Sequence, residues 1–310
     1  MWFKQLQLFE LTGPESITAS QLEEKLEPLA FTSCLPSLPS SIGWVAPIDV
    51  ENAPLVHTVN GYILFCLQIE EKILPATVIR QELQEKVKMI EITEDRRVRS
   101  KEKLTIKEEL TMTLLPRAFS KFTRLYAYID TKNKWLVLGT TNASKTEQFI
   151  SLYKRCVNEN IRLCELKKLS PLMTHCLKTQ NYPKEFSIEK SCVLQDPQQQ
   201  KRVIRCQQQN LFAGSIQELI KDGCEVKQLA MCWQDRVNFV FTDDFTVRGI
   251  QYQDEILSQA KDIESETREQ QLDADFFIMT ETLHGLIKDL MNMFTIPADA
   301  KLQNDQDLVA

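Results

Sequence analysis

The dipeptide Asn60-Gly61 constrains the fold more than any other short segment of this 310-residue chain. It lies between the apolar segments LVHTV and YILFCLQI, and both residues tolerate the positive φ angles of a type I′ turn. A second hairpin is predicted where FTRLYAYID (122–130) and KWLVLGT (134–140) flank three polar residues. Two tight hairpins favour an antiparallel sheet, and therefore an α+β fold over a doubly wound one.

Two amphipathic helices are predicted between these hairpins. Apolar residues recur at helical spacing from Ile79 to Ile90, after Pro75, and a second such run ends near Pro116. The segment TEDRRVRSKEK between the two runs contains no apolar residue except Val98. The sequence thus predicts a helical hairpin that projects from the body of the protein.

The remaining elements are predicted from the spacing of apolar residues and from capping and turn residues. They are a strand at 2–9, a helix at 20–31, a loop at 35–47 with three prolines, a helix that Ser144 and Glu147 open as a capping box, strands near 201–206, 225–233, 236–242 and 246–252, a short helix near 214–222 and a long helix at about 272–293. Residues 165–200 show little pattern. We expect a central α+β domain (1–75 and 117–165), a helical-hairpin tip (76–116), a base α+β domain (166–295) and a flexible tail (296–310).

Composition excludes several classes of protein. With 43% hydrophobic and 26% charged residues, the chain has the composition of an ordinary globular protein. No apolar stretch approaches the ~20 residues of a membrane span, and the first residues lack a signal-peptide pattern, so we expect a cytosolic protein without a membrane partner. The nine cysteines include no CxxC pair and there are three histidines, which argues against a disulfide framework, a metal site or a cofactor.

The best enzymatic candidate is the segment GTTNASKT (139–146), which nearly matches the phosphate-binding P-loop. In a divergent P-loop enzyme, Lys145 would neutralise phosphate charge and Asp243 would hold magnesium. However, Ser144 replaces the second glycine, and the preceding strand belongs to a tight hairpin, whereas a P-loop requires parallel crossover units. In the simpler interpretation Ser144 caps a helix and Lys145 is solvated. No nucleophile motif is present, and we expect no enzyme activity.

Charge is distributed unevenly along the chain. The formal net charge is -6, yet residues 96–124 contain nine bases and three acids, while residues 251–310 contain thirteen acids and four bases. Such segregation lets an acidic protein present a basic surface to a polyanion, and contacts with phosphates need no reading of bases. The alternative is a solvated helical hairpin with ordinary surface charge.

Several segments, in order along the chain, resemble one family. They are WFK (2–4), AFT (30–32), GWVAP (43–47), EEKILP (70–75), LLPRAFS (114–120), IDT (129–131) and LDADFFIMT (272–280). In these segments the chain is similar to the RdgC family of recombination-associated proteins from proteobacteria, from residue 2 to about residue 293.

The resemblance implies a DNA-binding protein without known catalysis. Its horseshoe-like subunits would close as a ring-shaped homodimer around single- or double-stranded DNA, without sequence preference, and would restrain the recombinase RecA. The helical hairpin would be the tip where two subunits meet, and the C-terminal half the base where they meet again. A cytoplasmic, nucleoid-associated location follows from this function.

The DNA-binding residues that we expect come from the basic segment and from the resemblance. They are Arg96, Arg97, Arg99, Lys101, Lys103, Arg117, Phe119, Lys121 and Gln209. Arg96 and Phe119 match family positions implicated in contacts and DNA binding, although Phe119, just beyond a helix end, could instead belong to the core. Gln207 and Gln208 stand where the family carries a basic residue before the glutamine that aligns with Gln209. A third alternative is a RecA partner that binds protein and makes no DNA contact.

Overall fold

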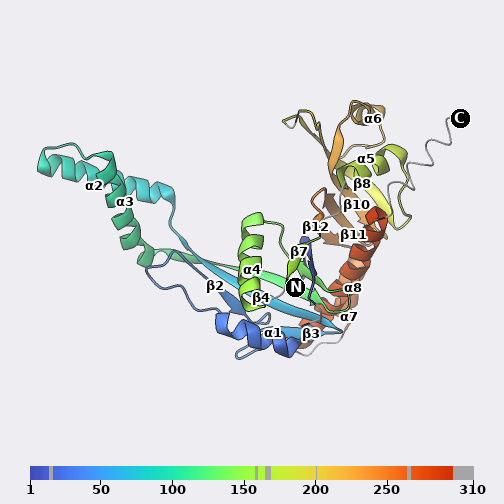
Figure 1. Ribbon diagram of the computed structural model, residues 1–310, viewed down its shortest axis with the longest axis horizontal. Coiled ribbons are helices and arrows are strands. Elements are labelled where there is room, and N and C mark those ends of the chain that lie inside the picture. Colours follow the sequence, from blue (N-terminus) through green and yellow to red (C-terminus); the bar gives the residue numbers. More distant parts are fainter. Residues whose placement is uncertain (14–16, 158–159, 165–168, 200, 264–266, 296–310) are drawn as a thin grey trace.

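The computed structural model describes residues 1–13, 17–157, 160–164, 169–199, 201–263 and 267–295, which form an α+β fold (Figure 1). The strands are β1 (Leu6–Leu11), β2 (Ser40–Val45), β3 (Val56–Val59), β4 (Tyr62–Ile73), β5 (Phe119–Asp130), β6 (Trp135–Leu138), β7 (Ile161–Leu163), β8 (Phe186–Gln195), β9 (Val203–Cys206), β10 (Glu225–Trp233), β11 (Val237–Thr242) and β12 (Thr246–Tyr252). The α-helices are α1 (Ala19–Leu26), α2 (Ala76–Glu94), α3 (Ser100–Leu114), α4 (Ala143–Cys156), α5 (Leu169–Thr179), α6 (Gly214–Lys221), α7 (Asp254–Asp262) and α8 (Arg268–Thr295). Short 3-10 turns, η1 (Glu27–Leu29) and η2 (Leu115–Arg117), follow α1 and α3.

All twelve of these strands belong to one sheet. Its order is β2-β4-β5-β6-β1-β12-β11-β10-β8-β9, with β3 added to β4 and β7 added to β1. Every pairing between these strands is antiparallel, which confirms the predicted antiparallel α+β class. The sheet runs without interruption through both the central and the base segments expected from the sequence.

The hairpin at Asn60-Gly61 is confirmed. Asn60 has φ 49° and Gly61 has φ 84°, the positive values that a type I′ turn requires. The turn pairs Val59 with Tyr62 and so begins β4. Because β4 is twelve residues long, it continues well beyond the four residues of β3.

A long two-stranded arm carries the predicted helical hairpin. β4 and β5 pair along their whole length, from Tyr62 with Asp130 to Ile73 with Phe119. At the far end of this arm, α2 and α3 lie away from the rest of the protein, at the left of Figure 1. The helical hairpin is therefore confirmed, and its connecting turn is shorter than predicted because helix α3 already begins at Ser100.

The two faces of the sheet contribute to different cores. Leu8 belongs to a core with Phe276 and Leu283 of α8, whereas the next residue, Phe9, belongs to a core with Phe149 of α4. Successive strand residues point to opposite faces, so one strand serves both cores. α8 therefore covers one face, while α4 packs on the other.

Two predicted boundaries near the amino end are wrong. β1 begins at Leu6 rather than at residue 2, and β2 lies inside the segment predicted as a loop. The prolines of that segment flank β2 instead of interrupting it, so each of its residues can pair with β4. Gly43 is needed for close packing, because a Cβ there would collide with the backbone of Phe31.

Other differences lie around α4 and in the second half of the chain. Asn142, not Ser144, caps α4: its side chain accepts from the backbone N–H of Lys145 at 3.1 Å. The weakly patterned segment 165–200 contains α5 and β8, and β7 and α7 were also not predicted. In β8, Lys190 interrupts the alternation of apolar residues, and register shifts in its pairing with β10 hide the strand period further. The predicted flexible tail (296–310) lies outside the described residues.

Candidate nucleic-acid interface

The tip is a helical hairpin with a very small core. Val87 of α2, Val98 of the turn and Ile106 of α3 are its buried residues. Asp95 ends α2 in the left-handed conformation with φ 46°, and the N–H of Val98 donates to Glu91 at 3.0 Å. These contacts fix the path of the turn and present its charged side chains at the end of the molecule.

Arg96 is bound within the tip itself. Its Nε donates to Glu94 at 2.5 Å, and its two terminal nitrogens donate to Glu102 at 2.8 and 2.6 Å. These hydrogen bonds raise the pKa of Arg96 and lower the pKa of the Glu102 carboxyl. Arg96 therefore closes the turn between the two helices, with part of its charge already compensated.

The other predicted bases of the tip are exposed. Arg97, Arg99, Lys101 and Lys103 surround the same turn, and within the described ranges none of them has an ion pair closer than 4 Å. The structure thus brings these four bases together. Such a cluster can hold phosphates without any base-specific contact.

A second group of predicted residues lies where the tip joins the arm. Arg117 ends η2, and Phe119 and Lys121 begin β5 on a common face. Phe119 is 84% exposed, so the alternative of a core residue is wrong. Its cross-strand partner Ile73 is 48% exposed, because this end of the arm is not covered.

The outer half of β5 also exposes an aromatic residue that sequence reasoning missed. Phe122 is 57% exposed and faces the side opposite Phe119. β6 pairs only with Ala127–Asp130 of β5, so the segment before Ala127 has β4 on one side and no strand on the other. A signal was available in the sequence, since Phe122 opens the predicted strand 122–130 between the bases Lys121 and Arg124.

Gln209 lies far from the other predicted residues. It follows β9 in an exposed loop, where its backbone N–H donates to the carbonyl of Lys190 at 3.1 Å. This part of the chain belongs to the end of the sheet opposite the tip (Figure 1). The predicted residues therefore form a tip cluster, a group at the root of the tip, and one separate loop.

The P-loop-like segment has a different geometry from a phosphate-binding loop. The strand before it, β6, pairs antiparallel with both β1 and β5. Gly139 serves packing, because a Cβ there would lie 3.1 Å from the carbonyl oxygen of Tyr126 and 3.2 Å from the ring of Phe3. With Asn142 capping α4, the segment has an ordinary structural explanation.

The cysteines and histidines that could carry chemistry are either buried or hold helix α8 in place. Burial raises the pKa of the Cys66 and Cys164 thiols to about 12, which makes them poor nucleophiles near neutral pH. His57 contacts Asp273 and His284 contacts Asp130, so both histidines fasten α8 to the β3–β5 region.

In the described part of the chain, no group of three or more His, Cys, Asp or Glu is placed to hold a metal ion. None of the described helices has the length and apolar character that crossing a membrane requires.

Comparison with known proteins decides the family. Residues 1–296 match the family model described as "Putative exonuclease, RdgC". The chain is 34% identical over 294 residues to the recombination-associated protein RdgC of Yersinia enterocolitica, with 94% of this chain and 97% of the relative covered. The same identity and coverage are found with the RdgC proteins of Yersinia pestis and Yersinia pseudotuberculosis.

The chain belongs to the RdgC family. The matched residues 1–296 include the arm, the tip and all twelve strands of the sheet. The resemblance drawn from short segments is therefore confirmed at the level of the family. The name of the RdgC relatives associates them with recombination.

Proposed function

We propose that this chain is a non-sequence-specific DNA-binding protein of the RdgC family. The observation that carries the proposal is the cluster of Arg97, Arg99, Lys101 and Lys103, exposed and without ion pairs in the described structure, at the end of a projecting arm. Lysine and arginine side chains neutralise phosphates and release counterions. The net charge of -6 keeps the remaining surface unfavourable for DNA, so binding concentrates at the basic region.

We further propose that two subunits, each with the shape of a horseshoe, close as a ring-shaped homodimer around DNA. The arm that holds α2 and α3 away from the sheet leaves space between the two ends of the molecule (Figure 1). DNA enclosed in this way, single- or double-stranded, is unavailable to RecA, which accounts for a role in recombination. Such a protein is expected at the nucleoid.

A salt titration tests the binding mode. Affinity for two duplexes of unrelated sequence should be equal, and log K should fall steeply and linearly with log salt concentration. Changing Arg97, Lys101 and Lys103 to Glu should weaken binding to both duplexes, whereas the same change at the exposed Lys25, Lys221 and Lys261 should have a small effect. A strong preference for one sequence, or a flat salt dependence, would contradict the proposal. RecA restraint that survives the tip reversal, in a protein whose wild type shows no DNA binding, would favour the RecA partner that binds only protein.

Topology provides a second test. A closed ring dissociates from DNA only at an end or by opening an interface, so salt-resistant complexes should form on circular DNA. Cutting the circle with a restriction enzyme should release the protein, while the length and sequence of the DNA stay the same. Equal release from intact and cut circles would exclude encirclement.

The family description raises exonuclease activity as another candidate. Two-metal nucleases clamp the reacting phosphate with metal ions held by clustered carboxylates, and the described residues present no such group of three. We propose binding without catalysis. End-labelled DNA incubated with protein and Mg²⁺ or Mn²⁺ should keep its label, and loss of label in proportion to the protein added would contradict this.

The divergent P-loop enzyme is the remaining alternative. It predicts that ATP raises the melting temperature and that Lys145→Ala abolishes the shift, because a ligand that binds only the folded state stabilises it. The antiparallel surroundings of β6 speak against it. A melting temperature that ATP does not change would dispose of this alternative.

A further inference from the structure

One buried carboxylate in the arm has no basic side chain beside it. Glu70 of β4 is 4% exposed, and within the described residues no Lys, Arg or His nitrogen lies within 4 Å of its oxygens. Burying an ionised carboxylate is costly unless hydrogen bonds or a charge partner compensate it. An apolar side chain would pack at this position without that cost, so the carboxylate needs an explanation of its own.

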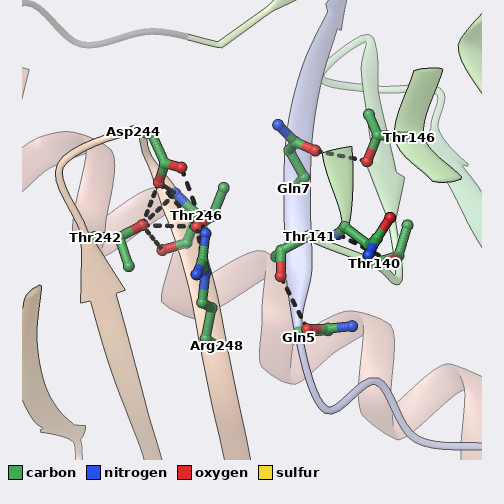
Figure 2. Close-up of polar contacts among 10 residues, drawn as sticks. Gln5, Gln7, Thr140, Thr141, Thr146, Thr242, Asp244, Thr246 and Arg248 are labelled. Atoms are coloured by element: carbon green, nitrogen blue, oxygen red, sulfur yellow. Dashed lines mark hydrogen bonds and ion pairs between the residues drawn. The ribbon is translucent and has the colours of Figure 1, made fainter. Parts of the chain in front are cut away.

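Two other acids of the sheet lie beside basic side chains. Asp130, which is also buried, lies 3.1 Å from Nδ1 of His284. Asp244, in the turn between β11 and β12, lies 3.6 Å from Nη2 of Arg248 (Figure 2). In the described structure, by contrast, the hydrogen bonds that Glu70 accepts come from neutral groups.

The two oxygens of Glu70 join segments that are far apart in the sequence. Ser120 of β5 donates its hydroxyl to Oε1 at 2.6 Å, and the backbone N–H of Cys34 donates to Oε2 at 2.8 Å. These two hydrogen bonds lower the pKa of the Glu70 carboxyl, and the bond from Ser120 has the larger effect. The carboxylate therefore ties both strands of the arm to the segment that contains Cys34.

Residues 32–39, which we call the brace loop, contact the arm beyond the last pair that β2 makes with β4. That pair is Ser40 with Glu71. One residue further along β4, the N–H of Lys72 donates to the carbonyl of Pro39 at 2.8 Å. The brace loop thus continues the support that β2 gives to the arm.

The arm needs this support because it narrows to two strands before the tip. β6 pairs with β5 only at Ala127–Asp130. Beyond the end of β2, β4 and β5 continue alone to Ile73 and Phe119. A two-stranded ribbon is marginally stable in water and twists more strongly than a wide sheet. Without a third support, the direction of the arm would vary, and the tip at its end would move with it (Figure 1).

We infer that Glu70 is a positioning residue that fixes the direction of the arm, and with it the place of the tip, through Ser120 and the brace loop. This inference rests on the proposed encirclement of DNA, because a ring stays closed only if each tip is held where its partner meets it. The bases around the turn of the tip lie at the far end of α2 from Glu70. Glu70 therefore controls how long the ring stays closed, and not how strongly the protein attracts DNA.

Ser120→Ala tests the inference without changing any charge. The half-life of salt-resistant complexes on closed circular DNA should fall roughly tenfold, the factor expected from the loss of one hydrogen bond to a charged group. Affinity for a short linear duplex, and its dependence on salt, should stay as in the wild type. Ser120→Thr keeps the hydroxyl and should keep the wild-type half-life.

Glu70→Gln is the second variant, with Glu71→Gln as its matched control. Both changes remove one negative charge from adjacent positions of β4, but Glu71 is exposed and points to the other face. The amide nitrogen of a glutamine is a donor, so at position 70 it would meet one of the two donors that the carboxylate now accepts from. Retention on circles should fall in Glu70→Gln and stay unchanged in Glu71→Gln.

The outcomes separate this inference from the proposed function. Wild-type protein that leaves intact circles as fast as cut ones contradicts encirclement, and the inference with it. Encirclement by the wild type, with unchanged retention in both Ser120→Ala and Glu70→Gln, overturns the positioning role alone. Equal losses in Ser120→Ala and Ser120→Thr, or a loss of linear affinity as large as the loss of retention, also overturn it, because general damage to the fold would then account for the data.

Discussion

At the scale of single residues, Arg96 differs from its neighbours although all carry the same charge. Its guanidinium is held by two carboxylates, whereas Arg97 and Arg99 are exposed. The sequence alone located the group of bases, because counting charged residues along the chain is enough to find a basic segment. It could not identify which base is paired, since Glu94 and Glu102 reach Arg96 only through the geometry of the turn.

Phe119 belongs to a residue type that is usually buried, yet the structure leaves its side chain exposed. Phe119→Ala should change the free energy of unfolding by less than about 0.5 kcal/mol, because an exposed side chain loses little packing. Phe149→Ala should cost about 3–5 kcal/mol, because that ring is fully buried against Trp44 and Phe65.

Urea denaturation of both variants measures this difference. DNA affinity and oligomeric state of Phe119→Ala, determined on the same preparation, then report on the surface role of the ring. Strong destabilisation by Phe119→Ala would mean that a contact within the subunit covers this ring.

At the scale of elements, turn chemistry and helix periodicity predicted more than strand alternation did. The Asn60-Gly61 hairpin, the second hairpin and both tip helices were found because each depends on local residues. β2 and β8 were missed because their evidence is not local: β2 is stabilised by pairing with β4, and β8 by pairing with β10 on one side and β9 on the other. The arrangement of the candidate site depends on the same long-range pairings, so the separation of the Gln209 loop from the tip could not be derived from spacing.

The tip should unfold independently of the sheet. Only Val87, Val98 and Ile106 form its buried core, and α2 and α3 contact little else. Ile106→Ala removes one of these three side chains, and a buried Ile→Ala change typically costs about 2–5 kcal/mol. We expect the hairpin to open locally while the sheet stays folded.

Hydrogen exchange measures this local opening. Amides of α2 and α3 should lose protection in Ile106→Ala, amides of β4 near Tyr62 should keep it, and DNA affinity should fall. Leu104→Ala on the same helix is the matched control, because Leu104 is 56% exposed and its loss should change little. Uniform loss of protection across the chain would show that tip and sheet unfold as one unit.

At the scale of the whole molecule, buried thiols link stability to pH. Burial raises the pKa of Cys66, Cys164 and Cys192 from an ordinary value of 9.0 to about 12 in the folded protein. Between about pH 9 and 12, the unfolded chain releases protons that the folded chain retains. The stabilising contribution is thus complete below pH 9 and is lost as the pH rises towards 12.

Urea midpoints at pH 8, 9 and 10 check this prediction. The midpoint should fall over this range, and the fall should be smaller in a variant in which these three cysteines are replaced by Ala. An identical fall in the variant would assign the effect to other groups, such as buried tyrosines.

The position of β1 in the sheet has a consequence for biosynthesis. β1 is the first strand of the chain, yet its partners in the sheet are β6, β7 and β12, which follow it by more than a hundred residues. A ribosome therefore releases most of the polypeptide before the sheet can close around its earliest strand, and such non-local pairing is slow. β6 and β7 can pair with β1 first, but the edge of β1 that receives β12 stays unpaired until residues 246–252 are made, so the two halves of the sheet join late in synthesis.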